Sequence, residues 1–278
     1  MKKLLIDVSF YQKTIDWEKV KSQIDGAILR VGYGGNLKNQ DDKQFVRNAN
    51  ECTRLGIPFG VYIYSYANTI EKAKSEAEHV LRLIKGYKLS YPVYLDLEDR
   101  KTMTCSKKMI GDMAEVFCKK IKEAGYYPAI YANKYWFESI LTDSRFNNWD
   151  RWVAQYSSKC TYKGKYSMWQ YSSKGMVNGI SGNVDMNYCY VDYTSIINGR
   201  TQVLVNIPDE EVHNQFKPYK VKINVSSVLN VRKGASTSYP IAAKLKNGEV
   251  YTIVDEKNGW GKLKSGVGWI CLKYTKKC

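Results

Sequence analysis

Two patterns of apolar residues alternate along the first two thirds of the chain. Short apolar runs bounded by Gly or Pro, such as those that follow Gly56 and Gly125, are typical of buried strands, whereas apolar residues at helical spacing indicate helices. The short runs predict strands at 3–8, 26–32, 57–65, 92–98, 127–132, 151–156, 166–171 and 183–187. Helical spacing predicts helices at 16–24, 40–55, 69–85, 106–124 and 134–141. Strands that alternate with helices form parallel sheets with crossover helices.

The pattern changes after residue 150, where the expected helices end and strands follow one another closely. We therefore expect the sheet to finish in hairpins. Eight strands with five helices predict an α/β fold, a barrel that is (β/α) in its first part and made of strands alone at its end. In α/β barrels the functional site lies at the carboxyl ends of the strands.

Residues 193–218 differ from the segments on either side. Pro208 and three successive acids at 209–211 stand there without a helical or strand period, which is typical of a linker. From 219 to 278 polar and apolar residues alternate between glycine turns, which predicts a small all-β barrel. We therefore expect three parts: 1–192, 193–218 and 219–278.

The net charge of +16 is concentrated in the last part of the chain. Residues 219–278 carry twelve Lys and Arg against three acids. A basic protein can bind nucleic acid, anionic lipid or an anionic polymer. The lysines are dispersed and no nucleic-acid motif is present, so nucleic acid is not an expected partner. No run of eighteen apolar residues exists, so we expect no membrane insertion.

Seven cysteines are scattered without a CxxC or Cys/His pattern, which indicates free thiols in a reducing compartment and no metal site or other cofactor. The start of the chain, Met1-Lys-Lys-Leu-Leu-Ile, is interrupted by Asp7 after three apolar residues. This run is too short for a signal peptide, so we read it as the first strand and expect synthesis in the cytoplasm without a leader.

Four acidic residues are expected at or near the carboxyl ends of strands: Asp7, Asp96, Glu98 and Asp185. Asp96 and Glu98 are two residues apart, so their side chains point to the same face of a strand. Burying like charges side by side is costly unless one of them holds a proton. A carboxylic acid next to a carboxylate is what cleavage of a glycosidic bond requires.

Ordered motifs strengthen this interpretation: DVSFYQ at 7–12, GVYIYSYA at 60–67, YLDLED at 94–99, PAIYA at 128–132, WVAQY at 152–156, MWQYS at 168–172 and VDMN at 184–187. In this order they resemble glycoside hydrolase family 25, the Chalaropsis-type lysozymes. The resemblance covers roughly residues 3–192. It implies a flattened, TIM-like (β/α)5(β)3 barrel that cleaves the β-1,4 bond between N-acetylmuramic acid and N-acetylglucosamine in peptidoglycan.

By this resemblance Glu98 is the general acid, with a pKa that Asp96 and burial should raise. Asp96 is the second carboxylate, and Asp7 and Asp185 flank the pair. The resemblance implies retention of configuration, with the substrate's N-acetyl oxygen as nucleophile and Asp96 orienting the amide. Direct attack by a carboxylate stays open, since two residues on one strand are compatible with the separation that it needs.

Further residues are candidates for binding the substrate because aromatic rings cover the apolar faces of sugars. They are Tyr62, Tyr64, Tyr131, Trp152 and Trp169, together with Gln170 and Arg30. Core packing is the alternative for each aromatic residue. Gln170 would bind a sugar hydroxyl or serve as a satisfied core amide, and Arg30 would pair with the acid cluster or form a separate ion pair.

The last part of the chain carries a second set of ordered motifs, with LNVRKGASTSYPI at 229–241, LKNGEV at 245–250, NGWGKL at 258–263 and GWI at 268–270. They resemble a bacterial SH3-like (SH3b) domain, which implies targeting to the cell wall. The wall-binding candidates are Asn230, Arg232, Tyr239, Trp260 and Trp269. For Asn230 and Arg232 the alternative is that they hold their loop together, and for the two tryptophans it is core packing.

Together the two resemblances predict a modular peptidoglycan hydrolase whose partners are peptidoglycan and an anionic wall polymer. Without a leader it would be a phage endolysin released through a holin, the alternatives being a bacterial autolysin and a wall-binding module with an inactive barrel. The sequence leaves the oligomeric state open.

Overall fold

The computed structural model of the protein describes residues 2–199, 218–257 and 259–278. These residues form two compact units, one before and one after the gap at 200–217. In these described ranges no helix is both long and apolar enough to cross a membrane.

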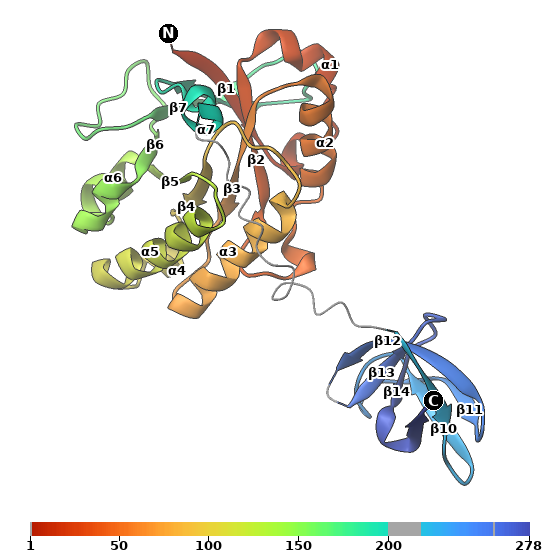
Figure 1. The fold of residues 1–278 in the computed structure, drawn as a ribbon. Helices are drawn as coiled ribbons and strands as arrows, with labels where there is room; N and C mark the ends of the chain where they lie inside the picture. The colour runs from red at the N-terminus through yellow and green to blue at the C-terminus, as the bar shows by residue number, and fades with distance from the viewer. Residues whose placement is uncertain (1, 200–217, 258) are drawn as a thin grey trace. The chain divides into compact units, whose positions relative to one another are not determined.

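The first unit is a closed barrel of eight strands (Figure 1). The strands are β1 (Lys3–Val8), β2 (Gly26–Tyr33), β3 (Phe59–Tyr64), β4 (Val93–Asp96), β5 (Pro128–Asn133), β6 (Asp150–Ala154), β7 (Met168–Gly175) and β8 (Val184–Cys189). Neighbours from β1 to β7 are parallel, and β8 is antiparallel to both β7 and β1. The expected eight-stranded α/β barrel is confirmed.

The expectation of hairpins after residue 150 is correct for β7–β8 and wrong for β6–β7. β6 and β7 pair in parallel, and residues 155–167 connect them without a helix. This connection is held by side chains, since Gln155 Nε2 and Lys134 Nζ each donate to the Thr161 hydroxyl, both at 2.9 Å. A loop that satisfies its own polar groups can make a parallel crossover as a helix does.

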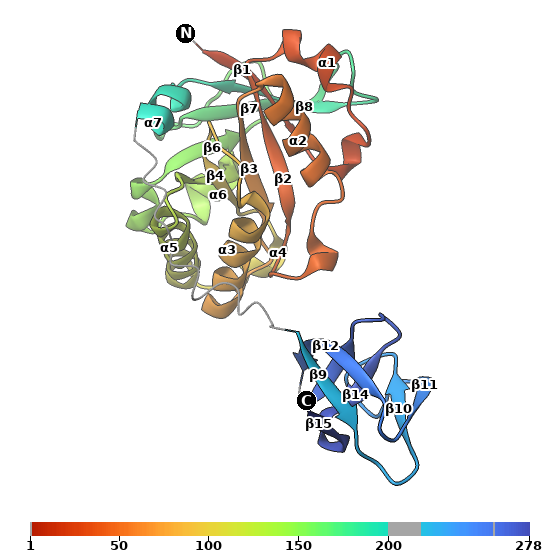
Figure 2. The ribbon, with the colours of Figure 1, turned by 45° about the vertical axis from the view of Figure 1, so that its right-hand side comes forward.

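Helices cover the outside of the barrel, and α2 and α3 both pack against β2 (Figure 2). The α-helices are α1 (Trp17–Val20), α2 (Phe45–Leu55), α3 (Ile70–Ile84), α4 (Arg100–Met103), α5 (Lys107–Glu123) and α6 (Lys134–Ser139), with 3-10 turns η1 (Phe10–Gln12), η2 (Lys21–Gln23), η3 (Lys38–Gln40) and η4 (Ser144–Asn148). Thr69 caps α3 by accepting a hydrogen bond from the Lys72 amide. The helix expected at 40–55 begins only at Phe45.

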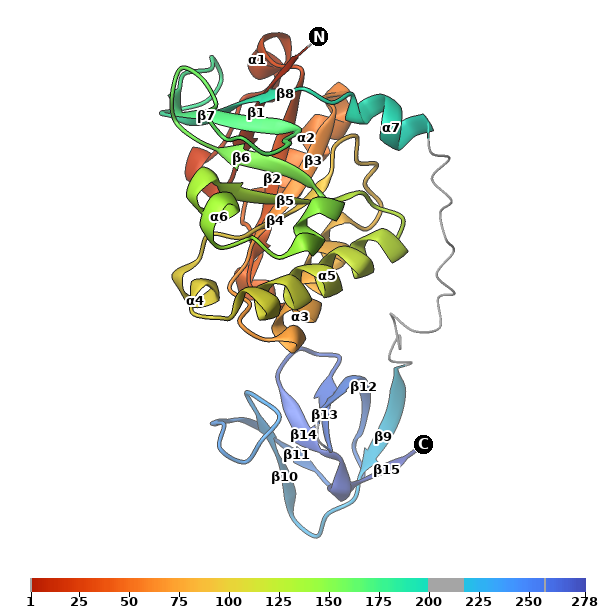
Figure 3. The same ribbon diagram turned by 90° about the vertical axis from the view of Figure 1, so that its left-hand side faces the viewer.

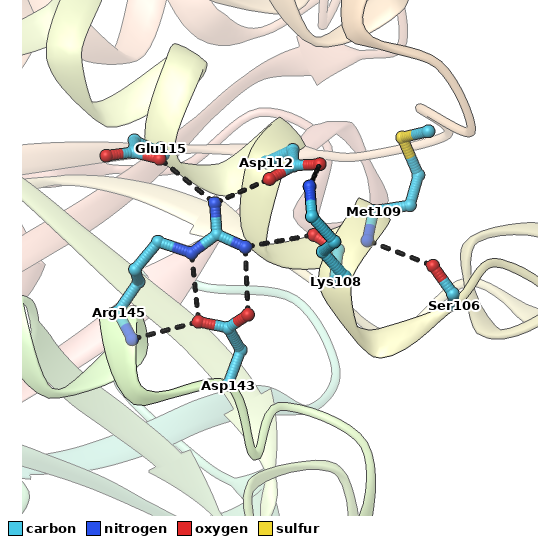
Figure 4. Close-up of polar contacts among 7 residues, drawn as sticks. All are labelled: Ser106, Lys108, Met109, Asp112, Glu115, Asp143 and Arg145. Atoms are coloured by element: carbon cyan, nitrogen blue, oxygen red, sulfur yellow. Dashed lines mark hydrogen bonds and ion pairs between the residues drawn. The ribbon is translucent and has the colours of Figure 1, made fainter.

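A cluster of charges fixes α5 to the turn η4 (Figure 4). The Arg145 guanidinium pairs with Asp143 at 2.8 Å, with Asp112 at 2.6 Å and with Glu115 at 3.0 Å. It also donates to the Lys108 carbonyl. The planar Arg145 guanidinium donates to several acceptors and thus connects the outer helix layer to the segment that leads into β6.

Period-two alternation divides the strand side chains between two cores. Outward-facing residues such as Ile6, Val61 and Val153 pack beneath the helices. Inward-facing residues such as Tyr94 and Trp152 fill the barrel interior. The interior is therefore packed rather than open along its length.

A seventh helix, α7 (Tyr193–Gly199), lies where we expected a linker to begin (Figure 3). Tyr193 is fully buried, its ring lies 6.2 Å from that of Tyr91 and 5.5 Å from that of Tyr127, and its hydroxyl donates to Asp150. These partners stand at the amino ends of β4, β5 and β6, so we call this cluster the closed end of the barrel. The linker prediction is therefore wrong for 193–199, because a buried tyrosine anchors the segment, and residues 200–217 of the predicted linker lie outside the described residues.

The second unit is an all-β sheet, as the sequence predicts. Its elements are β9 (Tyr219–Ile223), β10 (Val228–Arg232), β11 (Ile241–Lys246), β12 (Val250–Lys257), β13 (Trp260–Leu263), β14 (Trp269–Cys271), η5 (Leu272–Tyr274) and β15 (Thr275–Lys277), in the order β11-β10-β14-β13-β12-β9-β15. Val231, Ile253, Leu263 and Ile270 lie in its core and are at most 2% exposed.

Candidate active site

A cavity of about 690 Å³ opens at the end of the barrel where the parallel strands finish. We call this end the mouth. The cavity is lined by Asp7, Ser9, Phe10, Tyr11, Gln12, Arg30, Tyr33, Tyr62, Tyr64, Tyr66, Asp96, Glu98, Tyr131, Trp152, Tyr156, Gln170 and Asp185. The four acids expected from the sequence therefore meet in one cavity.

The four acids reach the cavity in two ways. Asp7 and Asp96 lie at or next to the carboxyl ends of β1 and β4, and Glu98 follows two residues after Asp96, with Leu97 buried outward between them. Asp185 instead lies at the amino end of β8, directly opposite Asp7 in the antiparallel register. The expectation that all four occupy carboxyl ends is wrong for Asp185, because β8 runs in reverse and brings its first residues to the mouth.

Asp7 and Asp185 form a proton-holding pair. Burial, with the Asp185 charge next in importance, raises the pKa of Asp7 to about 8. Burial raises the pKa of Asp185 to about 6. Two amides donate to Asp7 Oδ2, from Gln170 at 2.9 Å and from Asn187 at 2.8 Å, and they partly offset the rise. The raised pKa values favour a shared proton on this pair of carboxyl groups.

Asp96 and Glu98 are both shifted towards their protonated forms. Burial, then the charges of Glu98 and Asp7, hold the pKa of Asp96 well above its usual value. For Glu98 burial comes first, followed by the charges of Asp185 and Asp99. The expected rise in the Glu98 pKa is thus present; after burial it comes from the charges of Asp185 and Asp99, whereas the repulsion between Asp96 and Glu98 raises the pKa of Asp96. Asp96 Oδ1 is buried, and among the described residues it has no hydrogen-bond partner.

Hydrogen bonds make the floor of the cavity rigid. Gln170 donates to Asp7 and accepts from the hydroxyls of Tyr131 at 3.0 Å and Tyr156 at 3.2 Å. Trp152 Nε1 donates to Asn187 Oδ1 at 2.8 Å. Gln170 therefore acts as a satisfied core amide in this structure, and Trp152, only 1% exposed, packs beneath the acids.

Arg30 forms an ion pair, one of the two alternatives that the sequence left open for this residue. Its Nε donates to Asp42 Oδ2 at 2.8 Å, and the two side chains are 10% and 1% exposed. Arg30 also lines the cavity, where its charge opposes the rise in the Asp96 pKa. It therefore serves both alternatives, a buried ion pair with Asp42 and a positive charge that faces the acids.

The remaining aromatic candidates either line the cavity or point away from it, according to the face of the strand on which they lie. Tyr62 and Tyr64 line the cavity, half-buried, from alternate positions of β3. Trp169 does not line it, so the prediction of a sugar contact there is wrong. Its Nε1 donates to the Gln155 carbonyl, and its ring lies 5.8 Å from that of Tyr171. Since Gln170 points inward, period-two alternation turns Trp169 outward.

Several lining residues were missed from the sequence. Phe10, Tyr11, Tyr66 and Tyr156 line the cavity and are 38% to 69% exposed. Phe10 and Tyr11 stand inside the DVSFYQ motif directly after β1, so their position next to Asp7 was a usable signal. Asn187 shares a strand face with Asp185, and period two alone would have found it, whereas nothing local in the sequence marks Asp42 as the partner of Arg30.

In the second unit the candidates lie on the outward face and its loop. Trp269 pairs with Arg232 on β10 and with Lys262 on β13, and Trp260 pairs with Cys271. Both tryptophans are half-buried and lie outside the core cluster.

The first long loop of this unit is held from within. Arg232 donates to the Tyr239 carbonyl at 2.7 Å, which favours the loop-holding role for Arg232. Tyr239 is 49% exposed, and Asn230 is half-buried opposite Lys244 on β11.

Comparisons with known proteins agree with this architecture. Residues 6–180 match the profile of glycosyl hydrolases family 25, and residues 227–275 match that of the bacterial SH3 domain. The autolysin LytC of Streptococcus pneumoniae, solved with a synthetic peptidoglycan ligand, is 31% identical over 68% of this chain and 47% of its own, with a TM-score of 0.61. The CTP1L endolysin is 27% identical over 71% of this chain and 70% of its own, also with a TM-score of 0.61.

A curated relative is similar as well. The autolytic lysozyme of Clostridium acetobutylicum is 28% identical over 184 residues, which are 66% of this chain and 54% of that protein. The chain thus matches about half the length of LytC and of the autolytic lysozyme.

Proposed function

Since the chain belongs to the glycosyl hydrolases of family 25, we propose that its barrel hydrolyses the glycan strands of peptidoglycan. The observation that carries this proposal is the single cavity in which Asp7, Asp96, Glu98 and Asp185 meet. Glycoside hydrolysis needs one carboxyl group that donates a proton and a second that assists at the sugar. An autolytic lysozyme among the relatives and a peptidoglycan ligand on LytC support this substrate.

The proposed bond is the β-1,4 bond between N-acetylmuramic acid and N-acetylglucosamine. Glu98 donates its proton to the glycosidic oxygen as that oxygen leaves with the N-acetylglucosamine. Burial raises the pKa of Glu98, which favours the protonated form that this step requires. The resulting Glu98 carboxylate then takes a proton from the water that completes hydrolysis.

The proposed role of Asp96 is to orient the substrate's own N-acetyl group. Its buried Oδ1, without a partner among the described residues, is an acceptor for the amide N–H. The amide oxygen then attacks the anomeric carbon as the glycosidic bond breaks, and water opens the cyclic intermediate from the opposite face. Two displacements at one carbon retain the configuration.

The test is to digest purified peptidoglycan, reduce the products with borohydride and identify the reduced ends by mass spectrometry. Reduced muramic ends support the proposal, and reduced glucosamine ends would identify a glucosaminidase instead. Absence of new ends would leave a wall-binding protein with an inactive barrel. The anomeric form of the first product, read by NMR before mutarotation, tests retention.

For the second unit we propose binding to the cell wall, including its anionic polymers. Support comes from the outward face on which Trp269 stands between Arg232 and Lys262, since cations next to an aromatic ring suit phosphate-bearing or sugar ligands. Full-length protein with Trp269→Ala should sediment less with purified walls. Tyr274→Ala, another exposed aromatic of this unit, is the matched control, and equal sedimentation of both variants would contradict the role. Walls stripped of anionic polymer distinguish that ligand from peptidoglycan.

The similar proteins include both an endolysin and an autolysin, so they fit either cellular role. We propose the endolysin role with release through a holin. Expression in a host cell with and without a holin tests it: lysis only with the holin supports release by that route, and lysis without one favours an autolysin.

A further inference from the structure

Two neighbouring aromatic residues at the mouth have no role in the chemistry proposed above. Phe10 and Tyr11 lie in the turn η1 directly after Asp7, and both line the cavity. Phe10 is 38% exposed and Tyr11 69%, and their ring centroids are 4.1 Å apart. Single exposed aromatics are common on protein surfaces, but a pair at the wall of an acid-lined cavity is a candidate contact surface.

The backbone of this turn is held by its own hydrogen bonds. Ser9 and Gln12 form a reciprocal cap, with the Ser9 amide donating to Gln12 Oε1 at 2.9 Å. Gln12 Nε2 in turn donates to the Asn183 carbonyl at 3.2 Å, across to the segment that leads into β8. Lys13, at the end of the turn, has a φ of 55°, a costly conformation for a residue other than glycine. The turn thus keeps one shape despite its exposure.

A buried ion pair holds the two rings from beneath. Asp42 Oδ2 accepts both from the Phe10 amide at 2.9 Å and from Arg30 Nε at 2.8 Å. The Arg30 guanidinium lies 5.0 Å from the Phe10 ring centroid and 5.4 Å from that of Tyr11, within the range of a cation–π contact. One carboxylate oxygen therefore fixes both the backbone of the turn and the cation that contacts its rings.

Removing two charges from water is costly, and such a pair is not in itself a source of stability. Here the pair contacts two partly exposed rings that both line the cavity. A rigid, exposed aromatic surface suits a ligand with a flat apolar face and a polar rim, which describes an N-acetylhexosamine ring.

We propose that Phe10 and Tyr11 form a sugar-stacking platform at the mouth, positioned by the Arg30–Asp42 ion pair, that holds an N-acetylhexosamine of the glycan strand next to the acids. This inference rests on the proposed function, because it takes its ligand class from that substrate. Tyr11 provides the larger exposed face, and Asp42 is a positioning residue that acts through Arg30 and the turn.

The test measures binding apart from catalysis. Full-length Glu98→Gln protein is titrated by calorimetry with a soluble tetrasaccharide of alternating N-acetylglucosamine and N-acetylmuramic acid. Adding Tyr11→Ala should raise the Kd about tenfold, whereas Tyr11→Phe, which keeps the ring, should stay within about twofold. Tyr135→Ala is the matched control, since Tyr135 is 58% exposed on α6 and does not line the cavity.

Asp42→Asn tests the positioning role. It should also raise the Kd, and in a Tyr11→Ala background it should add little, because the platform is already lost. Additive losses would mean that Asp42 acts through general stability, which overturns its assigned role.

The outcomes separate this inference from the function on which it rests. If the Glu98→Gln protein binds the tetrasaccharide and Tyr11→Ala binds it equally well, the platform is wrong and the function stands. If the Glu98→Gln protein does not bind and the wild type releases no reducing ends, the proposed function is overturned and the platform with it.

Discussion

The two ends of the barrel are built from similar residues arranged for opposite purposes. At the closed end, Tyr91, Tyr127 and Tyr193 pack edge to face, and the Tyr193 hydroxyl donates to Asp150. At the mouth, tyrosines and aspartates again stand together, but the rings of Tyr11, Tyr66 and Tyr156 are exposed, and the buried Asp96 Oδ1 has no hydrogen-bond partner in the described ranges. Among the described residues each end leaves a buried polar atom without a partner, the Tyr91 hydroxyl at the closed end and Asp96 Oδ1 at the mouth. What separates the reactive end from the structural one is therefore a group of ionisable acids gathered in an open cavity.

The largest expected effect is at the mouth. Glu98→Gln removes the proton that must pass to the glycosidic oxygen, so the rate of wall lysis should fall about 10²–10⁴-fold while sedimentation with walls is unchanged. Turbidity loss and sedimentation measure the two effects. Glu123→Gln, on the exposed end of α5, is the matched control. Lysis at the wild-type rate by Glu98→Gln would remove Glu98 from the role of acid.

Substitutions at the closed end should change the stability of the protein rather than its rate of wall lysis. Tyr193→Ala empties a fully buried site and should lower the free energy of unfolding by about 3–5 kcal/mol. Tyr193→Phe loses only the hydrogen bond to Asp150 and should cost about 1 kcal/mol. Denaturant melts measure both. At temperatures where the variants are folded the lysis rate should be that of the wild type, and a large fall in rate would show that the two ends are coupled.

The free energy of unfolding at several pH values tests the mouth through Asp7, whose pKa in the folded protein is raised from 3.8 to about 8. Between about pH 4 and pH 8 the native protein holds a proton that the unfolded chain has released, so the stability from this group is complete below pH 4 and lost as the pH rises through 8. Asp7→Asn cannot ionise. Its free energy of unfolding relative to the wild type should therefore rise across this window, by up to about 1.4 kcal/mol per pH unit.

Calorimetric melts at several pH values measure this change. Asp16→Asn is the contrasting variant, because Lys19 lowers the pKa of Asp16 and its contribution is lost only as the pH falls below the ordinary range. Parallel stability curves for wild type and Asp7→Asn would refute the proton-holding pair.

The smallest effect is expected in the outer layer, which belongs to neither end. Arg145→Ala removes the cluster of Figure 4 and should lower the free energy of unfolding by about 1 kcal/mol, less at high salt, with no change in lysis rate. Arg145→Lys keeps the charge but lacks the planar guanidinium, so its free energy of unfolding should lie between those of the wild type and Arg145→Ala. A loss as large as that of Tyr193→Ala would contradict the view that buried packing dominates.

Much of the barrel and its four acids could be predicted because their signals are local. Apolar runs locate the strands, and an acid next to the end of such a run locates the site, as for Asp7 and Asp96. The direction of β8 and the helix at Tyr193 could not be predicted in this way, because each depends on contacts with distant segments. The same holds for Asp42, whose role arises only where β1 and β2 bring its partners together.

The reversed strand β8 also returns the chain to its starting point. It ends beside the first residues of β1, where Lys3 and Asp192 form an ion pair at 3.0 Å. The start of β1 and the end of β8 therefore lie side by side, at the end of the barrel away from the mouth. A circular permutant that connects the end of α7 to the start of β1, and so retains Tyr193, should keep the cavity when it is opened elsewhere, and the barrel can be inserted into another protein without obstructing its mouth.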